Sequence, residues 1–174
     1  MNLKIDQEDF KVDKKLNHQI SSYLYGEANY ISIYDVIKKY CFEDCKFIDV
    51  GSGCGKIVVY VVKNLGIYAD GVEIDRNRYN KSLNLLKEYN LYDKIEFLNQ
   101  DFQNIYFGNY DILYCCNLIF SDEHNIKLYN KILKEFNGIF LLFDFSNDIE
   151  EYLIDQITVK TSWNRGQTIF VFKK

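Results

Sequence analysis

The sequence predicts an open α/β fold with a seven-stranded, mostly parallel sheet, helices on both faces and a C-terminal antiparallel hairpin. Three observations predict it. Short apolar segments alternate with segments of helical periodicity between residues 31 and 145. A glycine loop, VGSGCGK (50–56), connects the first of these strands to a helix. Two β-rich segments around NRGQ (164–167) end the chain.

The strands are predicted from runs of apolar and β-branched residues between turn signals. The five parallel strands are KFIDV (46–50), IYADGVEI (67–74), IEFLN (95–99), YDILYCC (110–116) and GIFLLFDF (138–145). The hairpin strands are ITVKTSW (157–163) and TIFVFKK (168–174).

Four helices are predicted from apolar residues at helical spacing. They cover 31–40, 56–65, 76–89 and a segment that Ser121 or Asp122 caps and that extends through Phe136. The expected inner stripes are Ile33, Val36, Ile37 and Tyr40 in the first helix, Tyr79, Leu83 and Leu86 in the third, and Ile126, Tyr129, Ile132, Leu133 and Phe136 in the fourth. The second helix is apolar on nearly every face, so we expect it to be buried.

Composition limits the classes of partner. The 174 residues fit one domain, expected over 25–174, with residues 1–24 as a polar arm. A net charge of −4 argues against strong direct binding to nucleic acid but permits a basic protein partner. The N-terminal residues are charged and lack an apolar secretory segment, and no apolar run is long enough to span a membrane. We therefore expect an intracellular protein, in the nucleus or cytoplasm.

The five cysteines form neither a disulfide framework nor a zinc pattern. Cys41 and Cys45 are a CxxxC pair without a second pair or nearby histidines. Free thiols and no bound metal are the expectation.

The spacing of the glycine loop distinguishes among its possible ligands. A phosphate loop needs GxxxxGK[ST] and a nicotinamide loop needs GxGxxG, whereas Gly51, Gly53 and Gly55 form GxGxG. Asp49 precedes the loop, where it would repel a pyrophosphate but attract the amino group and sulfonium of S-adenosylmethionine (SAM). The loop therefore favours SAM.

Two further segments extend this site along the sheet. Glu73 ends the second strand, where a carboxylate can accept both ribose hydroxyls of an adenosine. Asp101 follows the third strand and can accept from the adenine amino group, while Phe102 can cover the ring. Three such residues in strand order favour SAM over NAD.

With these residues in hand, the chain resembles class I SAM-dependent methyltransferases, which have a Rossmann-like fold. More narrowly, it resembles the histone lysine methyltransferase family called disruptor of telomeric silencing (Dot-one). The matching segments are YGEA (25–28), DVGSGCGK (49–56), GVE (71–73), QDF (100–102), CNLIFSDE (116–123) and SW (162–163). Ala28 and Cys116 depart from the family, which has threonine and asparagine there.

The resemblance implies a set of site residues. Beyond the residues above, it places Tyr25, Gly26, Glu27, Ser52, Lys56 and Asn117 at the cofactor. The expected catalytic residues are Asn117, Phe120 and Trp163. Asn117 follows the fourth strand, where its amide can hold the target nitrogen or the methionine part of SAM, and we place Phe120 and Trp163 in an apolar channel for the substrate amine.

The expected reaction is methyl transfer to a lysine of a histone, presented free or in a nucleosome, or of a histone-like protein. A lysine amine has a pKa of about 10.4, so making it neutral near pH 7 costs about 4 to 5 kcal/mol. An apolar channel beside the sulfonium lowers that cost without a dedicated base. The alternatives are a non-histone protein lysine, a nucleic acid or a small molecule on the same fold. The absence of proline excludes the [ND]PP[FYW] motif of many nucleic-acid amino-methylating enzymes.

Overall fold

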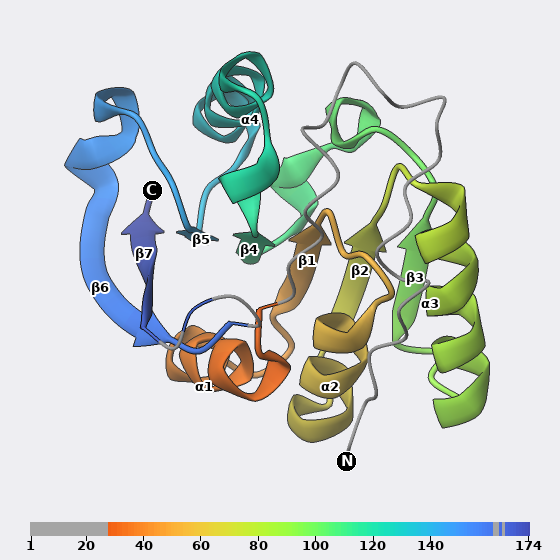
Figure 1. Cartoon of the computed structure of the whole chain (residues 1–174). Helices are drawn as coiled ribbons and strands as arrows, with labels where there is room; N and C mark the ends of the chain where they lie inside the picture. Colours follow the sequence, from red (N-terminus) through yellow and green to blue (C-terminus); the bar gives the residue numbers. More distant parts are fainter. Residues whose placement is uncertain (1–27, 162–163, 165) are drawn as a thin grey trace.

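The computed structural model describes residues 28–161, 164 and 166–174. Its centre is a seven-stranded sheet with the order β3-β2-β1-β4-β5-β7-β6, in which β7 runs antiparallel to β5 and β6 (Figure 1). The strands are β1 (Lys46–Val50), β2 (Tyr68–Val72), β3 (Ile95–Leu98), β4 (Ile112–Cys115), β5 (Ile139–Leu142), β6 (Leu153–Val159) and β7 (Gln167–Lys173). The predicted fold class is confirmed.

Helices cover both faces of this sheet, as predicted. The helices α1 (Tyr30–Tyr40), α2 (Lys56–Leu65) and α3 (Arg76–Tyr89) contribute to one apolar core, and α4 (Asp122–Glu135) contributes to the other. Side-chain caps begin three of them, since Asn29, Asp75 and Ser121 each accept backbone N–H groups of the first turn. The chain between β3 and β4 forms only short 3₁₀ turns, η3 (Phe102–Asn104) and η4 (Phe107–Asn109).

The structure corrects two of the inner stripes. Ile126 in α4 is 56% exposed, and Leu128 takes its place in the core beside Tyr129, Ile132 and Phe136. In α3 Leu83 is exposed while Leu86 is buried. Both residues follow helical spacing, but the sheet contacts only part of each helix, so spacing alone overestimates the buried stripe.

The hairpin begins earlier than its sequence pattern indicates. The strand β6 starts at Leu153 instead of residue 157, after the 3₁₀ segment η6 (Asn147–Tyr152), and ends at Val159. Beyond it, Thr161 pairs with Ala28, and the Asn29 N–H donates to the Lys160 carbonyl at 2.9 Å. This pairing places the residues that follow the YGE segment beside the end of β6.

Within the described ranges, no helix combines the length and apolar character needed to cross a membrane. The expected arm at 1–24 lies outside the described residues.

Candidate functional site

The predicted ligand loop lies at the carboxyl end of β1, between β1 and α2 (Figure 1). Its three glycines, Gly51, Gly53 and Gly55, have φ of 80°, 55° and 78°, in the left-handed region that favours glycine. The N–H groups of Gly51 and Ser52 both donate to the Val72 carbonyl, at 2.8 and 2.9 Å, and fasten the loop to the end of β2. The glycines therefore allow a tight turn that leaves backbone at the sheet edge, where ligands bind in open α/β folds.

Glu73 lies next to this loop at the end of β2, with 4% of its surface exposed. Its Oε2 accepts the Gly53 N–H at 2.9 Å. Its Oε1 accepts the Asp75 N–H at 2.7 Å and a guanidinium N–H of Arg78 at 3.1 Å. Glu73 thus joins the glycine loop to the first turn of α3.

Asp49, the acid that precedes the loop, is 2% exposed at the end of β1. Burial, and secondly the charge of Glu73, raise the pKa of the Asp49 carboxyl well above its ordinary value. A ligand cation at this point would favour ionised Asp49, so cation binding and proton loss are linked there.

This linkage predicts pH-dependent SAM binding. In the free protein Asp49 holds its proton until the pH passes its raised pKa, and the folded protein loses stability as the pH rises through that value. A cation beside Asp49 lowers its pKa, so binding releases a proton and affinity rises with pH, by at most about 10-fold per unit, below the raised pKa. Calorimetry in two buffers of different ionisation enthalpy measures the release. Asp49→Asn should eliminate it, and wild-type binding without proton release would contradict the assignment.

Two other loop side chains fit a polar ligand. Ser52 Oγ is buried and has no hydrogen-bond partner within the described part of the chain, which is costly unless a ligand or water supplies one. Lys56, the first residue of α2, is also buried. These features fit SAM: the positive-φ glycines allow a close approach to the backbone, the two buried acids match its cationic groups and ribose hydroxyls, and the Ser52 hydroxyl offers one further hydrogen bond.

The residues after β3 divide between cap and core. Asp101 caps η3 by accepting the Gln103 N–H at 2.9 Å, and it is half-buried. Phe102 is buried and stacks on Phe120, with ring centroids 5.9 Å apart and planes at 16°. The structure therefore brings together a predicted adenine-side residue and a predicted channel residue, from the ends of β3 and β4.

Asn117 is fully buried, with 0% exposed surface. Its Oδ1 accepts the N–H groups of Phe143 and Asp144 at 3.0 and 3.2 Å. Its Nδ2 donates to Asn125 Oδ1, the Tyr129 hydroxyl and the Asp144 carbonyl, at 2.9, 3.1 and 2.9 Å. Both polar atoms of the Asn117 side chain thus have protein partners, which connects the ends of β4 and β5 to α4.

Four predicted residues, Tyr25, Gly26, Glu27 and Trp163, lie outside the described residues. Sequence reasoning also missed two residues that hold Glu73. Arg78 pairs with its carboxylate, and Asn99 Nδ2 donates to the carbonyls of Glu73 and Ile74 at 2.9 and 3.1 Å. The position of Asn99 directly after β3 was the available signal, whereas Arg78 lies in the polar pattern of a helix and gave none.

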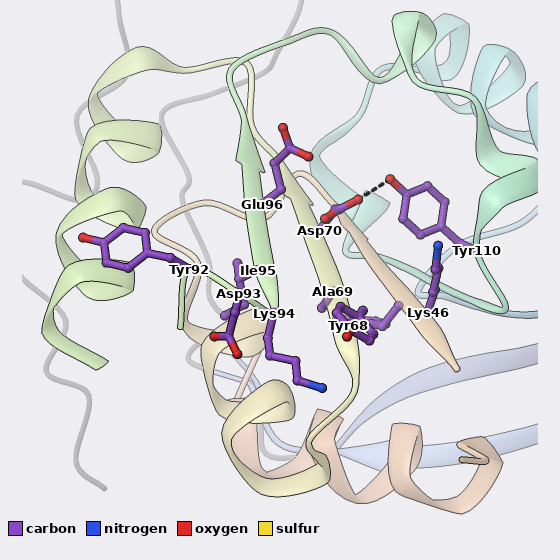
Figure 2. Close-up of a pocket in the computed structure, with 11 residues that line it drawn as sticks. Lys46, Tyr68, Ala69, Asp70, Tyr92, Asp93, Lys94, Ile95, Glu96 and Tyr110 are labelled. Carbon is purple, nitrogen blue, oxygen red and sulfur yellow. Dashed lines mark hydrogen bonds between the residues drawn. The ribbon is translucent and has the colours of Figure 1, made fainter. Parts of the chain in front are cut away.

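A cavity of about 240 Å³ lies at the other end of the sheet, beside the amino ends of β1, β2 and β3 (Figure 2). Its lining combines acids, lysines and tyrosines, and Tyr110 donates a hydrogen bond to Asp70 across it. Because it lies away from the glycine loop, it is separate from the site above. Across the described ranges, no three His, Cys, Asp or Glu residues are grouped to hold a metal ion.

Comparisons with known proteins identify the family of the chain and structures with a similar fold. A family model described as "Histone methylation protein DOT1" matches residues 10–139. One similar solved structure is an RNA methyltransferase from Salinibacter ruber in complex with S-adenosyl-L-homocysteine (SAH), with TM-score 0.68 and 19% identity, covering 81% of this chain and 89% of that one. Another is magnesium protoporphyrin IX methyltransferase from Synechocystis with bound SAM, with TM-score 0.68 and 14% identity, covering 83% and 78%. No curated protein sequence matches the chain.

Proposed function

The chain belongs to the DOT1 histone methylation family and is a SAM-dependent methyltransferase, and from this premise we propose that it methylates the side-chain amine of a lysine in a histone or histone-like protein. The family match over residues 10–139 is the observation that carries this substrate class. A role in chromatin regulation, in the nucleus, follows from the same proposal. The net charge of −4 supports a basic protein substrate over direct binding to nucleic acid.

The residues of the site divide the work along the sheet edge. Gly51, Gly53 and Gly55 let the methionine part of SAM approach the loop backbone closely. Asp49 faces the cationic groups of SAM, and Glu73 accepts a hydrogen bond from the ribose. When bound, SAM supplies a methyl group on a sulfonium, a good leaving group, so alignment and desolvation are the main requirements of the protein. The strand order puts β4 beside β1 on the side away from β2. We therefore place the acceptor over the ends of β4 and β5.

Phe120 supports an apolar acceptor path at that position. It is half-buried after β4, stacks on Phe102 and contacts the His124 ring edge-on, with centroids 6.5 Å apart. An apolar wall beside a sulfonium lowers the pKa of an approaching lysine, which makes the neutral, nucleophilic amine accessible. Trp163 joins this wall in the proposal, and Asp101 with Phe102 holds the adenine.

The test is methyl transfer from tritiated SAM, with core histones, nucleosomes, RNA and a host lysate assayed side by side. We expect label on histones or nucleosomes, and mass spectrometry should place it on a lysine nitrogen. Gly53→Arg serves as the inactive control. Label on another lysate protein would indicate a non-histone lysine methyltransferase. Label only on RNA or only on small molecules would refute the lysine proposal and leave the methyltransferase assignment intact.

A further inference from the structure

A buried ion pair lies at the acid assigned to the ribose. Arg78 Nη2 is 3.1 Å from Glu73 Oε1, and the two side chains are 6% and 5% exposed. Arg78 belongs to the first turn of α3, where its own N–H donates to the capping carboxylate of Asp75 at 2.9 Å. The cap and the ion pair together fix this arginine next to the site.

The hydrogen bonds of Glu73 leave little room for a ligand. A carboxylate has about four acceptor positions, two on each oxygen. Oε1 already accepts from Asp75 and Arg78, while Oε2 accepts only from Gly53. One acceptor position therefore remains, on Oε2.

The three existing donors resist displacement. The Gly53 and Asp75 N–H groups are backbone atoms of the glycine loop and the α3 cap, so they cannot turn away without refolding those segments. Arg78 is a side chain, but moving it off would separate two buried charges, which is strongly unfavourable.

We infer that Arg78 is a positioning residue that restricts Glu73 to a single ribose hydroxyl of the cofactor. This inference rests on the SAM site of the proposed function and narrows the sequence expectation that Glu73 accepts both hydroxyls. The second hydroxyl is bound elsewhere or remains in water, so only one of the two ribose hydroxyls donates a hydrogen bond to Glu73.

Three ligands test the inference: SAH, its 2′-deoxy analogue and its 3′-deoxy analogue, each titrated calorimetrically into the wild-type protein and Glu73→Gln. Losing a hydrogen bond to a charged group typically lowers affinity by about 10-fold or more. We expect that loss for one analogue in the wild type, with most of it absent in Glu73→Gln. The effect of removing the other hydroxyl should be the same in both proteins.

Arg78→Met tests the role of the arginine itself. The substitution frees an acceptor position on Oε1, so in Arg78→Met both ribose hydroxyls should contribute to affinity through Glu73. Titrating the three ligands into Arg78→Met and into Arg78→Met/Glu73→Gln measures this dependence. Arg76→Met is the matched control, because Arg76 is exposed on the same helical turn, and it should behave as wild type. A merely structural role for Arg78 would lower affinity for all three ligands equally.

The outcomes separate the inference from its premise. No SAH binding by the wild type would overturn the cofactor site and the inference with it. SAH binding in which both hydroxyls, or neither, depend on Glu73 would overturn the inference alone. An Arg78→Met protein that binds but retains the single-hydroxyl pattern would also overturn it. If that variant fails to fold, the wild-type and Glu73→Gln titrations still decide whether Glu73 binds one ribose hydroxyl or two.

Discussion

Gly53→Arg is expected to reduce the affinity for SAM and SAH by at least about 100-fold. Gly53 has a φ of 55°, is buried in the ligand loop and donates its N–H to Glu73 at 2.9 Å. A long cationic side chain there would occupy the cofactor volume beside the loop and add positive charge where the ligand is itself cationic. Blocking the close approach of the ligand to the loop backbone, together with the added positive charge, accounts for an effect of this size. Calorimetry with SAH measures it directly.

Gly66→Arg provides a matched control for the backbone strain. Gly66 has a φ of 72° at the C-terminal cap of α2, and a Cβ there would meet no atom within 4 Å. Both variants pay about 1 to 2 kcal/mol for a non-glycine residue in the left-handed region, so both should melt below wild type. Only Gly53→Arg should lose the ligand. Equal affinities in the two variants would remove the glycine loop from the cofactor site.

The sheet and helices were predictable because periodicity and turn chemistry agree locally. The bounds of β1, α2 and α3 coincide with the predicted 46–50, 56–65 and 76–89. Each is bounded by a strong signal, such as the glycine loop before α2 and the Asp75 cap before α3. Where such signals are weak, as at the start of β6, the prediction missed the boundary.

The grouping of the site residues was predictable for a topological reason. Carboxyl ends of adjacent parallel strands meet at one edge, so Asp49, Glu73 and the glycine loop had to converge once the strands were assigned in order. The partners of those residues were not predictable. Whether a buried carboxylate is free or bound to Arg78, and whether a buried amide is free or satisfied, depends on side-chain contacts between elements distant in sequence.

Asn117→Ala is expected to destabilise the fold more than it weakens cofactor binding. The sequence placed Asn117 at the reacting groups, but its amide makes five hydrogen bonds to its own chain. The substitution leaves the Phe143 and Asp144 N–H groups without this acceptor, and each unsatisfied buried group costs about 1 to 3 kcal/mol. We therefore expect a loss of about 3 kcal/mol, or a melting temperature lower by about 6 to 12 °C for a chain of this size.

Thermal and chemical denaturation measure this loss, with Asn130→Ala as the control because Asn130 is exposed on α4. Well below its melting temperature, Asn117→Ala should keep SAH affinity within about 3-fold, since its bonds run to α4 and the end of β5 and none runs to the glycine loop. Methyl transfer should fall, because Asn117 fixes the backbone of Asp144 beside the proposed acceptor path. A variant of wild-type stability that binds SAH yet transfers no methyl group would instead show that Asn117 contacts the substrate, and the five hydrogen bonds would then have to rearrange on binding.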